Sequence, residues 1–136
     1  MSEYRAEICA QSRHILVRFD GEISTPHYTD FRHDYNTICR HIMDADVPLV
    51  ILDLEQTTFF GSLFVGTMLK LSIRIRAAGG RMVICGLSEQ LMQLMQQLLL
   101  LERHAGEGIC LQHVASLAEA EALLEPASNT LHSHSA

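Results

Sequence analysis

The sequence predicts an α/β domain with a mixed, mostly parallel sheet of about five strands and four helices. Apolar runs of strand length alternate with segments whose apolar residues recur every three or four positions, as expected of strands joined by helical crossovers. Two strands come first without a helix between them, so they should form a hairpin and make the sheet mixed. The expected order is β-β-α-β-α-β-α-β-α, with right-handed crossovers.

The chain length fits one domain. A sequence of 136 residues with 48% hydrophobic content can bury one core, whereas two domains would each be marginal. We expect residues 1–124 to form this domain. Residues 125–136 are dominated by Ser, Asn, His and Ala, so we expect a disordered C-terminal tail.

The first half of the chain should hold the hairpin and one helix. Strands are expected over residues 3–10 and 14–20, and Asp20-Gly21 should end the second. Thr25-Pro26 is typical of a helix start, with threonine as the N-cap and proline in the first turn. The helix over residues 26–44 should bury one apolar stripe, made of Tyr28, Phe31, Tyr35, Ile38 and Ile42.

The best strand in the sequence is the uninterrupted apolar run over residues 49–54, which is typical of a central strand covered on both faces. A polar turn over residues 55–58 follows it. After Ser62, residues 63–78 should form a helix that Gly79-Gly80 ends. Its expected buried stripe consists of Phe64, Met68, Leu71 and Ile75.

The last third should supply two more strand and helix pairs. Residues 81–86 predict another covered strand, and Ser88 should cap a helix that runs to residue 101. That helix is apolar around more than half its circumference, which suggests a protein contact or self-association as a homodimer. A short strand over residues 109–114 and a helix starting at Ser116 should complete the fold.

Composition argues against several classes of function. The formal charge of −6 without a local basic patch predicts no nucleic-acid binding and no attraction to anionic membranes. We also expect no membrane span and no secretory signal, and hence a cytoplasmic protein. The spacing of the four cysteines fits no metal motif, and no glycine-rich phosphate-binding pattern is present, so we expect neither a metal nor another cofactor.

Two segments carry a resemblance to a known family. Residues 49–62 end a strand in Asp53-Leu54 and a short loop in Gly61-Ser62, and residues 71–88 run through Gly79-Gly80 into a second strand and a serine-capped helix. Together with Gly21-Glu22-Ile23, this pattern resembles the STAS domain of anti-sigma factor antagonists. The resemblance spans about residues 13 to 124, and its element order matches the order expected from periodicity.

The resemblance implies a regulatory protein that works by partner switching and not as an enzyme. In that family an antagonist binds an anti-sigma factor that is also a serine kinase of the ATPase type, which frees a sigma factor for transcription. Phosphorylation of the serine at the start of the second helix ends the binding, and Ser62 occupies that position. The implied partner-binding residues are Thr57, Thr58, Gly61, Ser62, Leu63 and Phe64.

The sequence departs from the family pattern around this serine. The preceding residue is usually Asp and is Gly61 here, which removes a carboxylate that could orient the hydroxyl or a metal ion. The small residues that usually follow are replaced by Leu63 and Phe64, and we expect Phe64 to crowd a kinase. One alternative is therefore that Ser62 is a plain N-cap.

Two further alternatives stay open. The first is a STAS module that cannot be phosphorylated and serves as a scaffold or sensor in a larger complex. The second is a receiver-like phosphoacceptor that uses Asp53 at the end of the central strand. Receiver chemistry needs several acids to hold Mg²⁺ and a nearby lysine, yet the last strand has no lysine and the first strands offer only Asp20.

Overall fold

The computed structural model describes residues 4–11, 13–24, 28–101 and 111–124. The predicted N-cap at Thr25-Pro26, the residues at 109–110 and the tail over 125–136 lie outside the described residues. In chain order the elements are β1 (Arg5–Ala10), β2 (Ile15–Ile23), α1 (Tyr28–Asp44), β3 (Leu49–Asp53), β4 (Thr57–Phe60), α2 (Ser62–Ala77), β5 (Arg81–Cys85), α3 (Glu89–Leu101), β6 (Gln112–Val114) and α4 (Leu117–Leu124).

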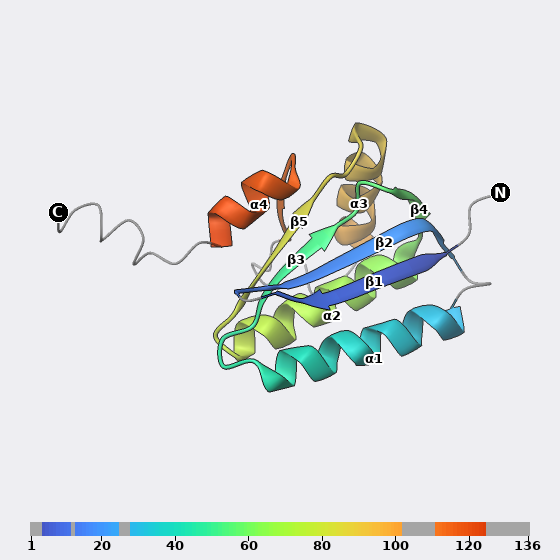
Figure 1. Ribbon diagram of the computed structural model, residues 1–136. Coiled ribbons are helices and arrows are strands. Elements are labelled where there is room, and N and C mark those ends of the chain that lie inside the picture. The colour runs from blue at the N-terminus through green and yellow to red at the C-terminus, as the bar shows by residue number, and fades with distance from the viewer. Residues whose placement is uncertain (1–3, 12, 25–27, 102–110, 125–136) are drawn as a thin grey trace, which may run out of the picture.

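The predicted fold class is confirmed. The strands form a mixed sheet in the order β1-β2-β3-β5-β6, in which β1 and β2 are antiparallel and the later neighbours are parallel. One face of the sheet is covered by α1, α2 and α3, and α4 lies on the other face (Figure 1).

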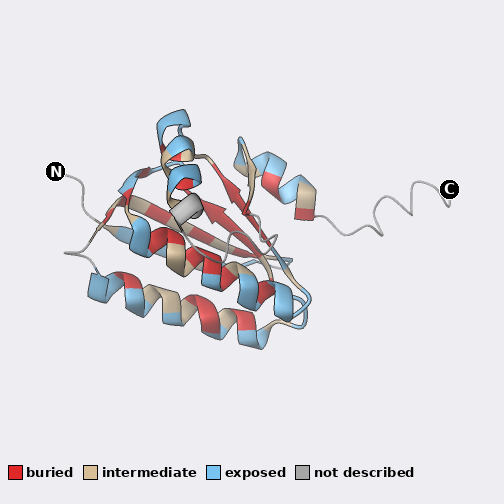
Figure 2. Cartoon of the chain, turned by 180° about the vertical axis from the view of Figure 1, so that it is seen from behind, coloured by how far each residue is buried: buried red, intermediate tan, exposed pale blue. Residues whose placement is uncertain are grey.

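The central strand β3 is buried from both sides, as its unbroken apolar run predicted. Val50 and Leu52 belong to the larger hydrophobic cluster with α1, α2 and α3, whereas Ile51 packs in a smaller cluster with Ala120 and Leu124 of α4. The buried positions accordingly lie on the strands and on the helix faces turned toward the sheet (Figure 2).

Helix α2 follows the predicted stripe. Phe64, Met68, Leu71 and Ile75 are each at most 1% exposed. The helix ends as expected, because Gly79 adopts a positive φ of 79° and the N–H of Gly80 donates to the carbonyl of Ile75. Similarly, the Ser88 hydroxyl accepts the N–H of Leu91 at the start of α3.

Strand β4 differs from the prediction, because the polar residues 55–58 predict a turn whereas residues 57–60 form a strand. The expectation that Asp20-Gly21 ends the second strand was also wrong. Gly21 has a φ of 85°, and the register shifts between Gly21 and Glu22, so β2 continues to Ile23. Its first half pairs with β3 and its last three residues pair with β4.

A matched pair of glycine substitutions should test the turn after α2. A Cβ at Gly80 would lie 1.9 Å from the Pro48 carbonyl oxygen, which is a backbone atom, so Gly80→Ala should cost about 3 kcal/mol of stability. Gly79→Ala meets no atom within 4 Å and should cost only about 1 kcal/mol, from its left-handed backbone. Urea unfolding of both variants measures these losses, and equal losses would contradict the close approach at Gly80.

Candidate functional site

The predicted site residues lie where β4 meets the start of α2. Gly61 is the N-cap of α2 and makes no side-chain capping bond, so Ser62 is the first helical residue. Ser62 is therefore not itself the N-cap. The Ser62 side chain is exposed, and the first turn of α2 carries no acidic residue. The partial positive charge of this helix end is thus not offset by a neighbouring carboxylate in the same turn.

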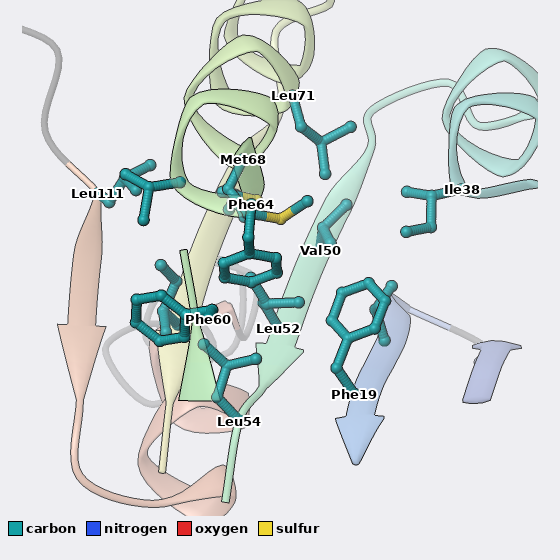
Figure 3. Packing of buried hydrophobic residues seen from close by; sticks show 14 of the residues in the cluster. Phe19, Ile38, Val50, Leu52, Leu54, Phe60, Phe64, Met68, Leu71 and Leu111 are labelled. Atoms are coloured by element: carbon teal, nitrogen blue, oxygen red, sulfur yellow. The ribbon is translucent and has the colours of Figure 1, made fainter. Parts of the chain in front are cut away.

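Phe64 holds the first turn of α2 against the sheet. Its side chain is 1% exposed, and its ring lies 5.0 Å from that of Phe60 and 5.7 Å from those of Phe19 and Phe31. Figure 3 shows Phe64 pointing from α2 into this cluster beside Phe60. The expectation that Phe64 crowds access to Ser62 is therefore wrong, because a helix that turns residue 64 inward turns residues 62 and 63 outward.

Thr57 is also an interior residue. It is 6% exposed, and its hydroxyl donates a 2.6 Å hydrogen bond to the carbonyl of Phe19 in β2. The Gly21 N–H donates to the carbonyl of Gln56 beside it. These bonds fix β4 against the end of β2, while Thr58 on the same strand is exposed.

A hollow of about 180 Å³ lies next to Ser62. Its lining comes from the end of β2, the start of α1, β4 and the first turn of α2, and consists of Ile23, Ser24, Tyr28, Phe31, Phe59, Gly61, Ser62, Leu63 and Phe64. Ile23, Phe31 and Phe64 are buried. The exposed lining residues are Tyr28, Phe59, Ser62 and Leu63, and we call these four the Ser62 rim.

Three side chains of the Ser62 rim expose apolar surface. Tyr28 is 42% exposed, Phe59 45% and Leu63 48%. Large apolar side chains gathered at the surface mark protein contacts more often than scattered ones do. Sequence reasoning missed Tyr28, because its spacing predicts a place in the buried stripe of α1. It placed the partner-facing loop over residues 56–62 but did not single out Phe59 within it. The adjacent pair Phe59-Phe60 was the available signal, since one of two neighbouring strand residues must face away from the core.

Both carboxylate oxygens of Asp53 have partners within the fold. Its carboxylate is 3.1 Å from the Arg18 Nε and also accepts the N–H of Glu55. Asp53 is 2% exposed, and its hydrogen bond raises the pKa of Arg18. Cys85 of β5 lies beside Asp53, and its burial is the main cause that raises the pKa of its thiol to about 12. Among the described residues, no group of three or more His, Cys, Asp or Glu side chains could hold a metal ion.

This geometry is unfavourable for a receiver-like phosphoacceptor at Asp53. Both carboxylate oxygens already have partners, and a phosphoryl group would break the pair with Arg18 inside the sheet. We therefore predict that incubation with acetyl phosphate leaves the intact mass of the protein unchanged. A gain of one phosphoryl group that Asp53→Asn abolishes would contradict this prediction, and mass spectrometry distinguishes the two results.

Comparison with known proteins agrees with the fold. The family model described as the STAS domain matches residues 5–108. No curated protein matches the chain. Within the described residues, no helix has the length and apolar character to cross a membrane.

Several solved structures are similar to this chain over most of both lengths. An anti-sigma-factor antagonist (STAS) domain protein from Planctomyces limnophilus is 18% identical, with a TM-score of 0.68 over 89% of this chain and 98% of that chain. A serine-to-glutamate variant of RsbS from Moorella thermoacetica is 10% identical, with a TM-score of 0.71 over 92% and 98%. The Bacillus cell fate determinant SpoIIAA, solved in its phosphorylated form, is 19% identical, with a TM-score of 0.62 over 89% and 96%. At these identities the likeness establishes the fold alone.

Proposed function

Because this chain belongs to the STAS domain family, we propose that it is an anti-sigma factor antagonist that binds its partner through the Ser62 rim. The observation that carries this proposal is the exposed Ser62 hydroxyl at the first residue of α2, flanked by exposed Phe59 and Leu63. The fold shared with anti-sigma factor antagonists supports it. The proposed role is binding and not catalysis.

The proposed partner-binding set differs in two residues from the set that the sequence suggested. Thr57 and Phe64 are buried, so we assign them to positioning β4 and α2. Thr58, Gly61, Ser62 and Leu63 remain as contact residues, and Phe59 and Tyr28 join them from the Ser62 rim. The contact surface then combines apolar side chains with hydroxyl groups, a composition that suits a reversible protein interface.

Phosphorylation of Ser62 would act on this surface by charge. A phosphate adds about −1.5 to −2 charges at pH 7. The fold can carry it because the start of α2 has backbone donors without a side-chain cap and no acid in its first turn. A partner that buries Phe59 and Leu63 would also have to desolvate the phosphate, and this cost would end binding.

The proposed partner is an anti-sigma factor that is also a serine kinase of the ATPase type. Such a kinase needs ATP, so the proposed setting is the cytoplasm. Leu63 and Ser62 are both exposed, so the large residue that follows the serine does not bury the hydroxyl. The absence of the usual Asp at Gly61 instead leaves the orientation of the hydroxyl to the kinase.

Labelling should test the proposed phosphosite. The protein is incubated with ATP and a candidate ATPase-type serine kinase from the same organism, and the product is mapped by mass spectrometry. We expect one phosphoryl group on Ser62, none in Ser62→Ala, and unchanged labelling in Ser72→Ala, whose serine is half-buried on the same helix. Binding without any label would instead favour the alternative of a STAS scaffold that cannot be phosphorylated.

Two alanine substitutions on α2 should test whether the partner binds at the Ser62 rim. Leu63→Ala removes an exposed side chain of the Ser62 rim and should weaken kinase binding about tenfold, equal to about 1.4 kcal/mol. Ile73→Ala removes a side chain that is 38% exposed near the other end of α2 and should leave binding unchanged. Both should change stability by less than about 1 kcal/mol. Calorimetric titration measures the affinities, and an equal effect of the two substitutions would place the interface elsewhere.

A further inference from the structure

Among the described strands, β1 lies at the edge of the sheet. It is first in the sheet order, with β2 as its neighbour, and α1 packs against the face of these two strands (Figure 1). In an edge strand, half of the main-chain N–H and C=O groups point away from the sheet and can pair with another strand. The apolar side chains of β1 are only partly covered, since Ala6 and Ile8 remain half-buried although they pack against the core.

Opposite charges face each other across β1 and β2. In the antiparallel register Arg5 lies opposite Asp20, and Glu7 lies opposite Arg18. Arg18 in turn bonds to Asp53 of β3. Charges of alternating sign therefore run across three strands on the face opposite to α1. The row ends at β1 with Arg5 and Glu7, both exposed.

A second copy of β1 would continue this alternation. If the two strands pair antiparallel about a twofold axis at Ala6, Arg5 of each copy lies opposite Glu7 of the other. A row through the two sheets then reads Asp53, Arg18, Glu7, Arg5 and Asp20, with opposite charges at every step. On the other face, Tyr4 lies opposite Ile8, and both are core-packed residues.

The other antiparallel registers are less favourable. With an axis at Arg5, the two Arg5 side chains lie opposite each other, and with an axis at Glu7 the two Glu7 side chains do, so like charges repel. An axis at Ile8 puts Glu7 opposite Cys9 and leaves the charges without a counterpart. An axis between two residues places charged side chains on the apolar face. Among axes at residues 5 to 8 of β1, the charge pattern thus selects the register centred on Ala6.

We propose that this protein forms a homodimer in which β1 pairs antiparallel with β1 of a second copy about a twofold axis at Ala6. The contact is isologous, so it closes with two copies and leaves no further free edge at this side. Main-chain hydrogen bonds supply affinity, and the Arg5 and Glu7 pairs fix the register. The homodimer does not depend on the proposed function, because it uses a different surface from the Ser62 rim.

Charge substitutions test the proposal by sedimentation equilibrium. Glu7→Arg and Arg5→Glu each set like charges opposite one another, so each should raise the dimer dissociation constant about tenfold or more. Combining both substitutions restores opposite charges between the copies and should restore the dimer. The double variant still disturbs the pairing with Arg18 and Asp20 in its own chain, so recovery cannot come from better folding. A wild-type protein that stays monomeric up to its solubility limit overturns the proposal.

Cysteine cross-linking tests the register itself. In a chain with Cys9→Ser and Cys110→Ser, Ala6→Cys should give a disulfide-linked dimer under mild oxidation, because the two residues at position 6 face each other. Ile8→Cys should not, because each residue at position 8 lies opposite Tyr4 of the other copy. Circular dichroism confirms that both variants fold. Equal cross-linking at the two positions, or none at position 6 in a folded protein, overturns the register.

Discussion

The packing of Phe64 is the constraint on which the proposed site depends. Its ring is enclosed by Phe19 of β2, Phe31 of α1 and Phe60 of β4, with centroid distances of 5.0 to 5.7 Å. Aromatic pairs in this range contribute specific attraction beyond the burial of their area. Since the helix period then fixes which residues face outward, the ring that anchors α2 also exposes Ser62 and Leu63.

The site is assembled from segments that are far apart in the sequence. Thr57 bonds to the carbonyl of Phe19, and β4 pairs with the end of β2 beyond Gly21. The start of α1 adds Tyr28 to the same hollow. Because β4 and α2 are joined only by Gly61, the strand pairing positions the first turn of the helix and thereby the Ser62 hydroxyl. A phosphate there would stand beside the apolar side chains that we propose the partner covers.

Local patterns predicted most of the fold and part of the site. The apolar run of β3 and the stripe of α2 could be predicted because each is a pattern within one segment. Strand β4 was not readable, because its pairing depends on a bulge at Gly21 in a distant strand. Tyr28 fitted the period of α1, yet it is the first residue of that helix and lies at the rim of the core. The inward position of Phe64 follows from the apolar stripe of α2. The resemblance, which leads one to expect small residues after the serine, instead suggested that Phe64 faces the partner.

The central claim is that an exposed hydroxyl at the head of α2 marks a docking face that added negative charge disables. The most direct measurement is the affinity of the kinase partner for Ser62→Asp relative to Ser62→Ala, by calorimetric titration. The account predicts that Ser62→Ala binds as the wild type does and that Ser62→Asp binds at least about tenfold more weakly, since each 1.4 kcal/mol is a factor of ten. Equal affinity of the two variants would contradict it.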